Sequence, residues 1–212
     1  LVDGPSDSKL ATLTLPTGLG KTFTGLSAAF EAREILDEQS QPDEGDRVLV
    51  YALPYTSIIE QTRELFEDPD LWGANPQQSA LTVHHYLSET VVRSGERDAS
   101  DTNATDADET AEFLGETWRD GTILTTFVQL FESLAGPSNR QGLKLSALES
   151  SIVILDEPQA LPKDWWDGIE RLLELLTTEY DAHVLAMTAT QPSLVRNMET
   201  VSLLDAGQAH EP

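Results

Sequence analysis

The chain has 212 residues, enough for one substantial domain with its own hydrophobic core. Its 37 acidic residues outnumber the 13 basic ones, giving a formal net charge of −24, and cysteine is absent. These numbers exclude disulfides and thiolate metal sites, and no apolar run approaches the ~18 residues that a membrane span needs. We therefore expect a cytoplasmic protein with no membrane partner.

The acidic excess has two interpretations. A solvated, self-repelling surface requires no specific partner. Alternatively, a surface rich in Asp and Glu and poor in Lys is typical of proteins that stay soluble in molar salt, where the screening length falls to ~3 Å. We favour a haloarchaeal or otherwise halophilic source, which weakens the usual inference that an acidic protein does not bind nucleic acid.

Short apolar runs alternate along the chain with segments of helical periodicity. We expect strands at residues 11–15, 47–53, 79–85, 122–126, 151–157 and 182–188, and helices at 21–36, 56–66 and 164–176. Strands this apolar, separated by helices, predict an α/β domain with a mainly parallel sheet and helices on both faces. In the last helix the side chains expected to face the core, from their spacing, are Trp165, Ile169, Leu172, Leu173 and Leu176.

Residues 94–112 differ from the rest of the chain. They contain no Val, Ile or Leu and are rich in Asp, Thr and Ala, so they cannot bury enough apolar surface to offset their ordering entropy. We predict a disordered acidic loop inserted in a single domain that covers residues 1–212. The chain does not start with Met, and we expect it to be a fragment of a longer protein.

The first candidate site is LPTGLGKT, residues 15–22, between a predicted strand and a predicted helix. A phosphate loop needs backbone N–H groups that converge on phosphate oxygens at a helix N-terminus. Lys21 would contact the β- and γ-phosphates and Thr22 would bind Mg²⁺, although the usual consensus has glycine where Leu15 stands. The phosphate-contacting residues of this loop would be Pro16, Thr17, Gly18, Leu19, Gly20, Lys21 and Thr22.

The second candidate site follows the apolar run SIVIL, where Asp156 and Glu157 would lie at the carboxyl end of a buried strand. Ligands bind at that edge of open α/β sheets. Asp156 would hold Mg²⁺ through water, and Glu157 would orient or deprotonate the attacking water. Further along, in MTATQP, Thr188 and Thr190 could link these carboxylates to a neighbouring site by hydrogen bonds.

Two further loops place hydroxyl residues at a strand end beside a helix N-terminus. They are Thr56 and Ser57 in one loop, and Thr125 and Thr126 in the other. Such groups suit contacts to a nucleic-acid backbone, while simple N-capping is the alternative for each loop. Elsewhere, we interpret the pair His84 and His85 as structural and not metal-binding, and the pair Trp165 and Trp166 as core residues and not base-stacking ones.

In this order, the motifs resemble the first RecA-like motor domain of superfamily-two helicases. PTGLGKT resembles motif I, whose opening position varies; DEPQ resembles motif II and TAT motif III; and the hydroxyl loops resemble motifs Ia and Ib. The stretches YALPYTSIIEQT, VHHYLSE, WRDGTILTTFVQLFESL and SIVILDEPQALP further resemble the CRISPR-associated helicase of type I interference systems. The resemblance covers roughly residues 11 to 192.

The resemblance implies a motor that uses ATP and Mg²⁺ to translocate on single-stranded DNA and unwind invader DNA. In it, Lys21, Thr22, Asp156, Glu157 and Gln159 match the ATP site. The implied partners are a second RecA-like domain, an HD nuclease, fused or separate, and the RNA-guided surveillance complex. Neither the HD motif nor the second motor domain with its arginine finger is present in this sequence. An RNA helicase, another superfamily-two ATPase and a non-hydrolysing recruitment module are the alternatives.

Overall fold

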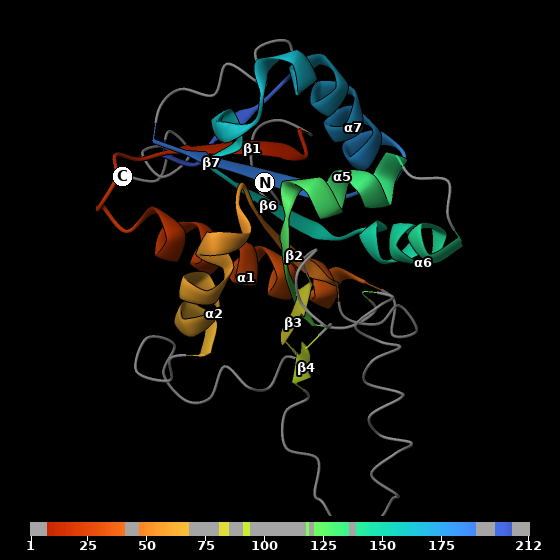
Figure 1. Cartoon of the computed structure of the whole chain (residues 1–212), viewed down its shortest axis with the longest axis horizontal. Coiled ribbons are helices and arrows are strands. Elements are labelled where there is room, and N and C mark those ends of the chain that lie inside the picture. Colours follow the sequence, from red (N-terminus) through yellow and green to blue (C-terminus); the bar gives the residue numbers. More distant parts are fainter. Residues whose placement is uncertain are drawn as a thin grey trace, which may run out of the picture.

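The computed structural model describes residues 8–40, 47–67, 81–84, 91–93, 118, 121–135, 139–189 and 198–204. Figure 1 shows their arrangement. The elements are β1 (Leu10–Thr14), α1 (Lys21–Gln39), β2 (Leu49–Leu53), η1 (Thr56–Ile58), α2 (Ile59–Glu67), β3 (Leu81–His84), β4 (Val91–Arg93), β5 (Thr122–Thr126), α5 (Phe127–Ala135), α6 (Asn139–Leu148), β6 (Ile152–Asp156), η3 (Pro158–Ala160), η4 (Lys163–Trp165), α7 (Trp166–Thr178), β7 (His183–Thr188) and β8 (Val201–Ser202).

Within these ranges eight strands form one sheet in the order β4-β3-β5-β2-β6-β7-β1-β8. The neighbouring strands pair in parallel, except that β4 runs antiparallel to β3 at one edge. The mainly parallel sheet that the sequence predicts is therefore confirmed. Because the parallel strands point the same way, β1, β2, β5, β6 and β7 all end at one edge of the sheet.

Helices cover both faces of the sheet, as expected (Figure 1). On one face, α1 and α2 contribute Leu26 and Ile59 to a core that also contains Tyr51 and Met187. On the other face, α5, α6 and α7 contribute Phe127, Leu148, Leu173 and other side chains to a second core. The central strands β2 and β5 are buried along their whole length, which explains why they appear in the sequence as continuous apolar runs.

The predicted elements all correspond to observed ones, and β5 begins and ends where predicted. The helix start expected after Thr126 is that of α5, and the elements that we did not expect are β4, α6, η3 and β8. The strands β4 and β8 have three and two residues, which is too short for a period of two to be recognised. Residues 94–112 lie outside the described part of the chain.

The expectation for Trp165 is wrong. It lies in the 3₁₀ turn η4 before α7, and half of its surface is exposed. A 3₁₀ turn has three residues per turn, so the 3.6-residue spacing cannot be extended through it. Trp166 packs against the core instead, and its indole N–H donates to the Leu161 carbonyl at 3.1 Å. Leu173 and its predicted companions Ile169 and Leu176 are buried, and Leu172 packs partly buried against the same core.

Candidate nucleotide-binding site

The loop between β1 and α1 is exposed and is shaped by two glycines. Gly18 and Gly20 have φ values of 83° and 75°, a backbone conformation that glycine adopts with little cost. A Cβ at either position would meet nothing within 4 Å, so the need for glycine is conformational. The Leu15 N–H donates to the Thr188 carbonyl at 3.1 Å, continuing the β1–β7 ladder. The pairing thus continues one residue beyond β1, and the turn itself begins at Pro16.

Lys21, the first residue of α1, is a buried cation. Only 9% of its surface is exposed, and its ammonium forms an ion pair with the Glu157 carboxylate. The same Nζ lies 3.6 Å from Asp156 Oδ1. Burying a charge is costly unless a partner offsets the lost hydration. The two carboxylates at the end of β6 supply that partner, so this contact joins the first two candidate sites of the sequence into one.

Asp156 has two carboxylate oxygens in different environments. Oδ2 accepts a 2.8 Å hydrogen bond from the Tyr51 phenol on β2. Oδ1 is buried and has no hydrogen-bond partner among the described residues. Burial raises the pKa of Tyr51 well above its usual value, the Asp156 charge and hydrogen bond raise it further, and the nearby Thr22 side chain opposes them. The phenol therefore keeps its proton.

Glu157 is part of a second polar network. Its backbone has φ 57°, in the left-handed region, and its N–H donates to the Met187 carbonyl at 2.8 Å. Its carboxylate accepts hydrogen bonds from the Gln159 amide and, at 3.2 Å, from the Ala189 N–H. The Gln159 amide oxygen accepts from the Thr188 hydroxyl at 2.8 Å. A continuous chain of polar contacts thus runs from β7 through Glu157 to α1.

The structure brings most of the predicted site residues together at the carboxyl edge of the sheet. Thr190 lies outside the described residues. The sequence did not indicate Tyr51, whose only signal is that it is the one hydrogen-bond donor side chain in the buried strand LVYAL. The predicted residues that meet here are Lys21, Thr22, Asp156, Glu157, Gln159 and Thr188. Their roles in catalysis and coupling stay predictions.

The site suits Mg²⁺ better than a metal held by protein alone. Among the residues that the structure describes, no three His, Cys, Asp or Glu side chains gather as ligands. Mg²⁺ commonly keeps several waters and is held by one or two carboxylates together with substrate phosphates. Asp156 Oδ1, buried and lacking a hydrogen bond, is a carboxylate oxygen left for that purpose.

The two loops predicted to contact nucleic acid differ from each other in exposure. Thr125 is completely buried and Thr126 is 5% exposed, so neither hydroxyl is presented to solvent. The Thr126 hydroxyl accepts the Gln129 N–H at 3.3 Å, which is the N-capping alternative. In the other loop Ser57 is exposed and Thr56 is half-buried.

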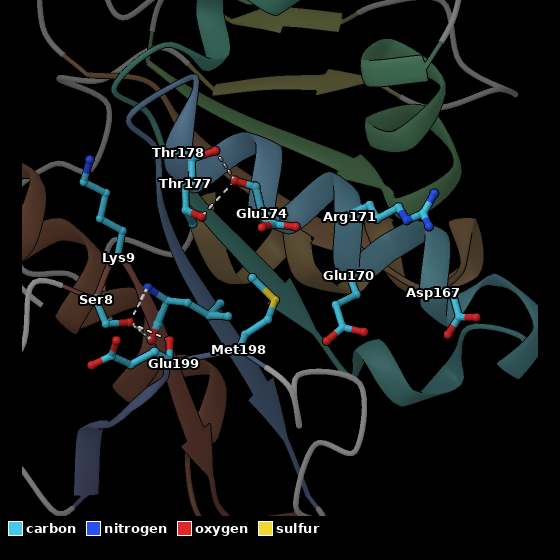
Figure 2. A pocket seen from close by; sticks show the side chains of 11 residues that line it. Ser8, Lys9, Asp167, Glu170, Arg171, Glu174, Thr177, Thr178, Met198 and Glu199 are labelled. Atoms are coloured by element: carbon cyan, nitrogen blue, oxygen red, sulfur yellow. Dashed lines mark hydrogen bonds between the residues drawn. The ribbon is translucent and has the colours of Figure 1, made fainter.

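A groove of ≈ 740 Å³ lies elsewhere, along the exposed side of α7 and beside the start of β1 (Figure 2). Its lining includes Glu170, Arg171 and Glu174 from α7 and Ser8 and Glu199 from the opposite side. Ser8 donates to the Glu199 carbonyl at 2.7 Å. The groove shares no residue with the site at the carboxyl edge.

The glycine loop, the buried lysine and the acid pair at the end of β6, on a parallel sheet covered on both faces, define a RecA-like domain. The chain belongs to the family described as type III restriction enzyme, res subunit, whose model matches residues 6–193. No helix within the described residues is long and apolar enough to cross a bilayer.

The chain is similar to the CRISPR-associated nuclease/helicase Cas3 of Haloferax volcanii, with 72% identity over 202 residues. That match covers 95% of this chain and 21% of the relative, so the chain spans about a fifth of that protein. Among solved structures, the Pyrococcus furiosus Hef helicase domain aligns with 91% of this chain and 35% of its own, at 18% identity and a TM-score of 0.50. At that identity the likeness concerns the fold alone.

Proposed function

We propose that this chain is the ATP-binding motor domain of a DNA helicase that translocates on single-stranded DNA and unwinds invader DNA in type I CRISPR interference. The observation that carries the proposal is the contact of Lys21, at the start of α1, with Asp156 and Glu157 at the end of β6. The 72% identity to a protein named as a CRISPR-associated nuclease/helicase supports the choice of system.

Each part of the site has a task in ATP binding and hydrolysis. The exposed loop N–H groups and the N-terminus of α1 attract phosphate oxygens, which would take over from Glu157 as partners of the Lys21 ammonium. Glu157, once released, would orient or deprotonate the attacking water, with Gln159 holding its carboxylate. Asp156, through water, and Thr22 would hold Mg²⁺, which when bound neutralises charge on the phosphates.

The nucleic-acid interface is proposed at the same edge of the sheet, after β2 and β5. Because the Thr125 and Thr126 hydroxyls are buried, we assign this role to exposed groups of the neighbouring loop, Ser57 and the backbone beside it. A second RecA-like domain, an HD nuclease and the RNA-guided surveillance complex complete the proposed assembly. An arginine finger supplied by another domain is worth ~10³–10⁵ in rate, so the chain alone is expected to bind ATP and turn it over slowly.

Nucleotide titration of Lys21→Ala tests the site. The substitution removes the buried cation and should abolish binding of a fluorescent ADP analogue in the presence of MgCl₂. Lys9→Ala is the matched control, because Lys9 also forms an ion pair, with Asp181, but lies at the opposite end of β1. Equal affinity of Lys21→Ala and the unmodified chain would mean that the loop is only a turn.

The choice of nucleic acid is tested on the longer protein that contains this chain. We expect single-stranded DNA to raise the rate of ATP hydrolysis above the rate without nucleic acid. Stimulation by single-stranded RNA alone would indicate an RNA helicase. Binding of nucleotide with no hydrolysis under any condition would indicate a recruitment module.

A further inference from the structure

Tyr51, on β2, is hydrogen-bonded to a carboxylate of the proposed Mg²⁺ site that comes from another strand. Its phenol donates to Asp156 Oδ2, at the end of β6, at 2.8 Å. The Tyr51 side chain is 0% exposed, so water does not compete for this bond.

The direction of the hydrogen bond follows from the protons available. A carboxylate only accepts, so the phenol must use its single proton on Asp156. The Asp156 Oδ2 atom is therefore held by a donor on a neighbouring strand.

The two carboxylate oxygens of Asp156 therefore have different surroundings. Oδ2 is occupied by the phenol, while Oδ1 has no hydrogen bond among the described residues and lies 3.6 Å from the Lys21 ammonium. The oxygen that remains, Asp156 Oδ1, is the kind of group that binds Mg²⁺ directly or through a water. Without the phenol, the Asp156 carboxylate could rotate.

We propose that Tyr51 is a positioning residue for Mg²⁺. By donating to Asp156 Oδ2, it fixes the orientation of that carboxylate and leaves Oδ1 for the Mg²⁺ of the bound nucleotide. The inference rests on the proposed function, since it assumes that a Mg²⁺–nucleotide occupies the site. Hydrogen bonds of this second layer commonly change metal affinity by ~10–100-fold when they are removed.

Tyr51→Phe is the direct test, because it removes only the hydroxyl oxygen and keeps the ring that packs edge-on against Phe66, with centroids 5.7 Å apart. The dissociation constant of a fluorescent ADP analogue is measured in EDTA and across a MgCl₂ series. We expect Tyr51→Phe to raise the half-saturating MgCl₂ concentration by ~10-fold or more and to leave the affinity in EDTA unchanged. Circular dichroism checks that the variant is folded.

Tyr180→Phe is the matched control. It also removes one phenol oxygen, but Tyr180 lies at the opposite edge of the sheet, where its carbonyl accepts the Ser150 N–H. We expect it to leave the MgCl₂ series unchanged. An equal loss of affinity by Tyr51→Phe in EDTA and in MgCl₂ would show a merely structural role and overturn the inference.

A double substitution keeps the inference testable if Tyr51→Phe also weakens the fold. Asp156→Asn removes the charge that Tyr51 orients, so in its background Tyr51→Phe should have little further effect on the MgCl₂ series. Full additivity of the two substitutions would overturn the inference. If the unmodified chain fails to bind the ADP analogue at any MgCl₂ concentration, the proposed function fails first, and this outcome is distinct from an unchanged Tyr51→Phe.

Discussion

Gly25→Ala is expected to destabilise the domain, although alanine is the better helix former. Gly25 is buried on α1, and a Cβ placed there would lie 1.9 Å from Met187 Sδ, 3.3 Å from its Cε and 3.4 Å from its Cγ. Met187 is itself fully buried in β7, so its side chain cannot move into solvent. The added methyl group must therefore separate α1 from β7 or force Met187 into another rotamer.

Two opposing contributions set the size of the effect. Overpacking of a filled core costs ~1–3 kcal/mol, whereas replacing glycine by alanine inside a helix gains ~1 kcal/mol. Because the contact to sulfur is so short, the net loss in the free energy of unfolding should be about 1–2 kcal/mol. For a domain of this size that corresponds to a fall of roughly 2–8 °C in melting temperature.

Gly168→Ala is the matched control, since Gly168 lies in α7 and its Cβ would meet nothing within 4 Å. It should raise stability by up to ~1 kcal/mol.

Urea unfolding at constant KCl measures both variants together with Met187→Val, which removes the atoms that clash. In the double variant Gly25→Ala with Met187→Val, the new methyl group occupies space that the shorter side chain leaves. The two effects should therefore differ from additivity by at least ~1 kcal/mol, and additive values would refute the reasoning.

The same contact links packing to the site. Lys21 lies one helical turn before Gly25 on α1, and the Met187 carbonyl accepts the Glu157 N–H at 2.8 Å. Separation of α1 from β7 would therefore move the lysine away from its carboxylates. We expect Gly25→Ala to weaken binding of the ADP analogue as well, and Gly168→Ala to leave it unchanged.

Two further predictions concern pH and salt. Burial, assisted by the charge of Lys9 and opposed by Asp181, lowers the pKa of His183 in the folded chain below its usual 6.5. The unfolded chain therefore takes up a proton on His183 at a higher pH than the folded chain does. The free energy of unfolding should consequently fall as the pH drops below ~6.5. His183→Gln should flatten this decline in urea unfolding between pH 7 and pH 5, and an identical slope in both proteins would contradict the assignment. The net charge of −24 predicts that the melting temperature rises steeply between ~0.1 M and ~2 M KCl, because screening removes repulsion. Sucrose at equal osmolality is the control, and no response to KCl would exclude the halophilic interpretation.

The sequence predicted the framework of the site because two simple rules determine it. Buried parallel strands appear as apolar runs, so the predicted strand ends at residues 15 and 157 lie within one residue of the observed ends of β1 at Thr14 and of β6 at Asp156. The carboxyl ends of such strands share one edge, which brings the glycine loop and the acid pair together. The ion pair of Lys21 with Glu157 is the observed consequence.

The side-chain environments could not be derived in the same way. Thr125 lies near the end of one predicted strand and Ser57 follows another, so the sequence treats them alike. The structure shows that Thr125 is buried in the sheet and that Ser57 is exposed in a 3₁₀ turn. Tyr51 contacts Asp156 across 105 positions of sequence, and this pairing depends on the register of β2 against β6. Register is a property of the whole sheet, so a hydroxyl in an apolar strand gives no local sign of its partner.

The charges around the site explain how so acidic a chain could still bind an anionic nucleotide. Repulsion from the surface is screened within ~3 Å at 1 M salt, so a nucleotide in concentrated KCl would sense mainly the groups it touches. Those groups are one buried ammonium, two carboxylates and the N–H groups of the loop. One cation against two anions leaves the site short of positive charge for a triphosphate. The proposed Mg²⁺ would supply the missing charge, and we therefore expect nucleotide affinity to depend far more on MgCl₂ than on KCl. The opposite order would mean that surface repulsion, and not the contacts around Lys21, limits binding.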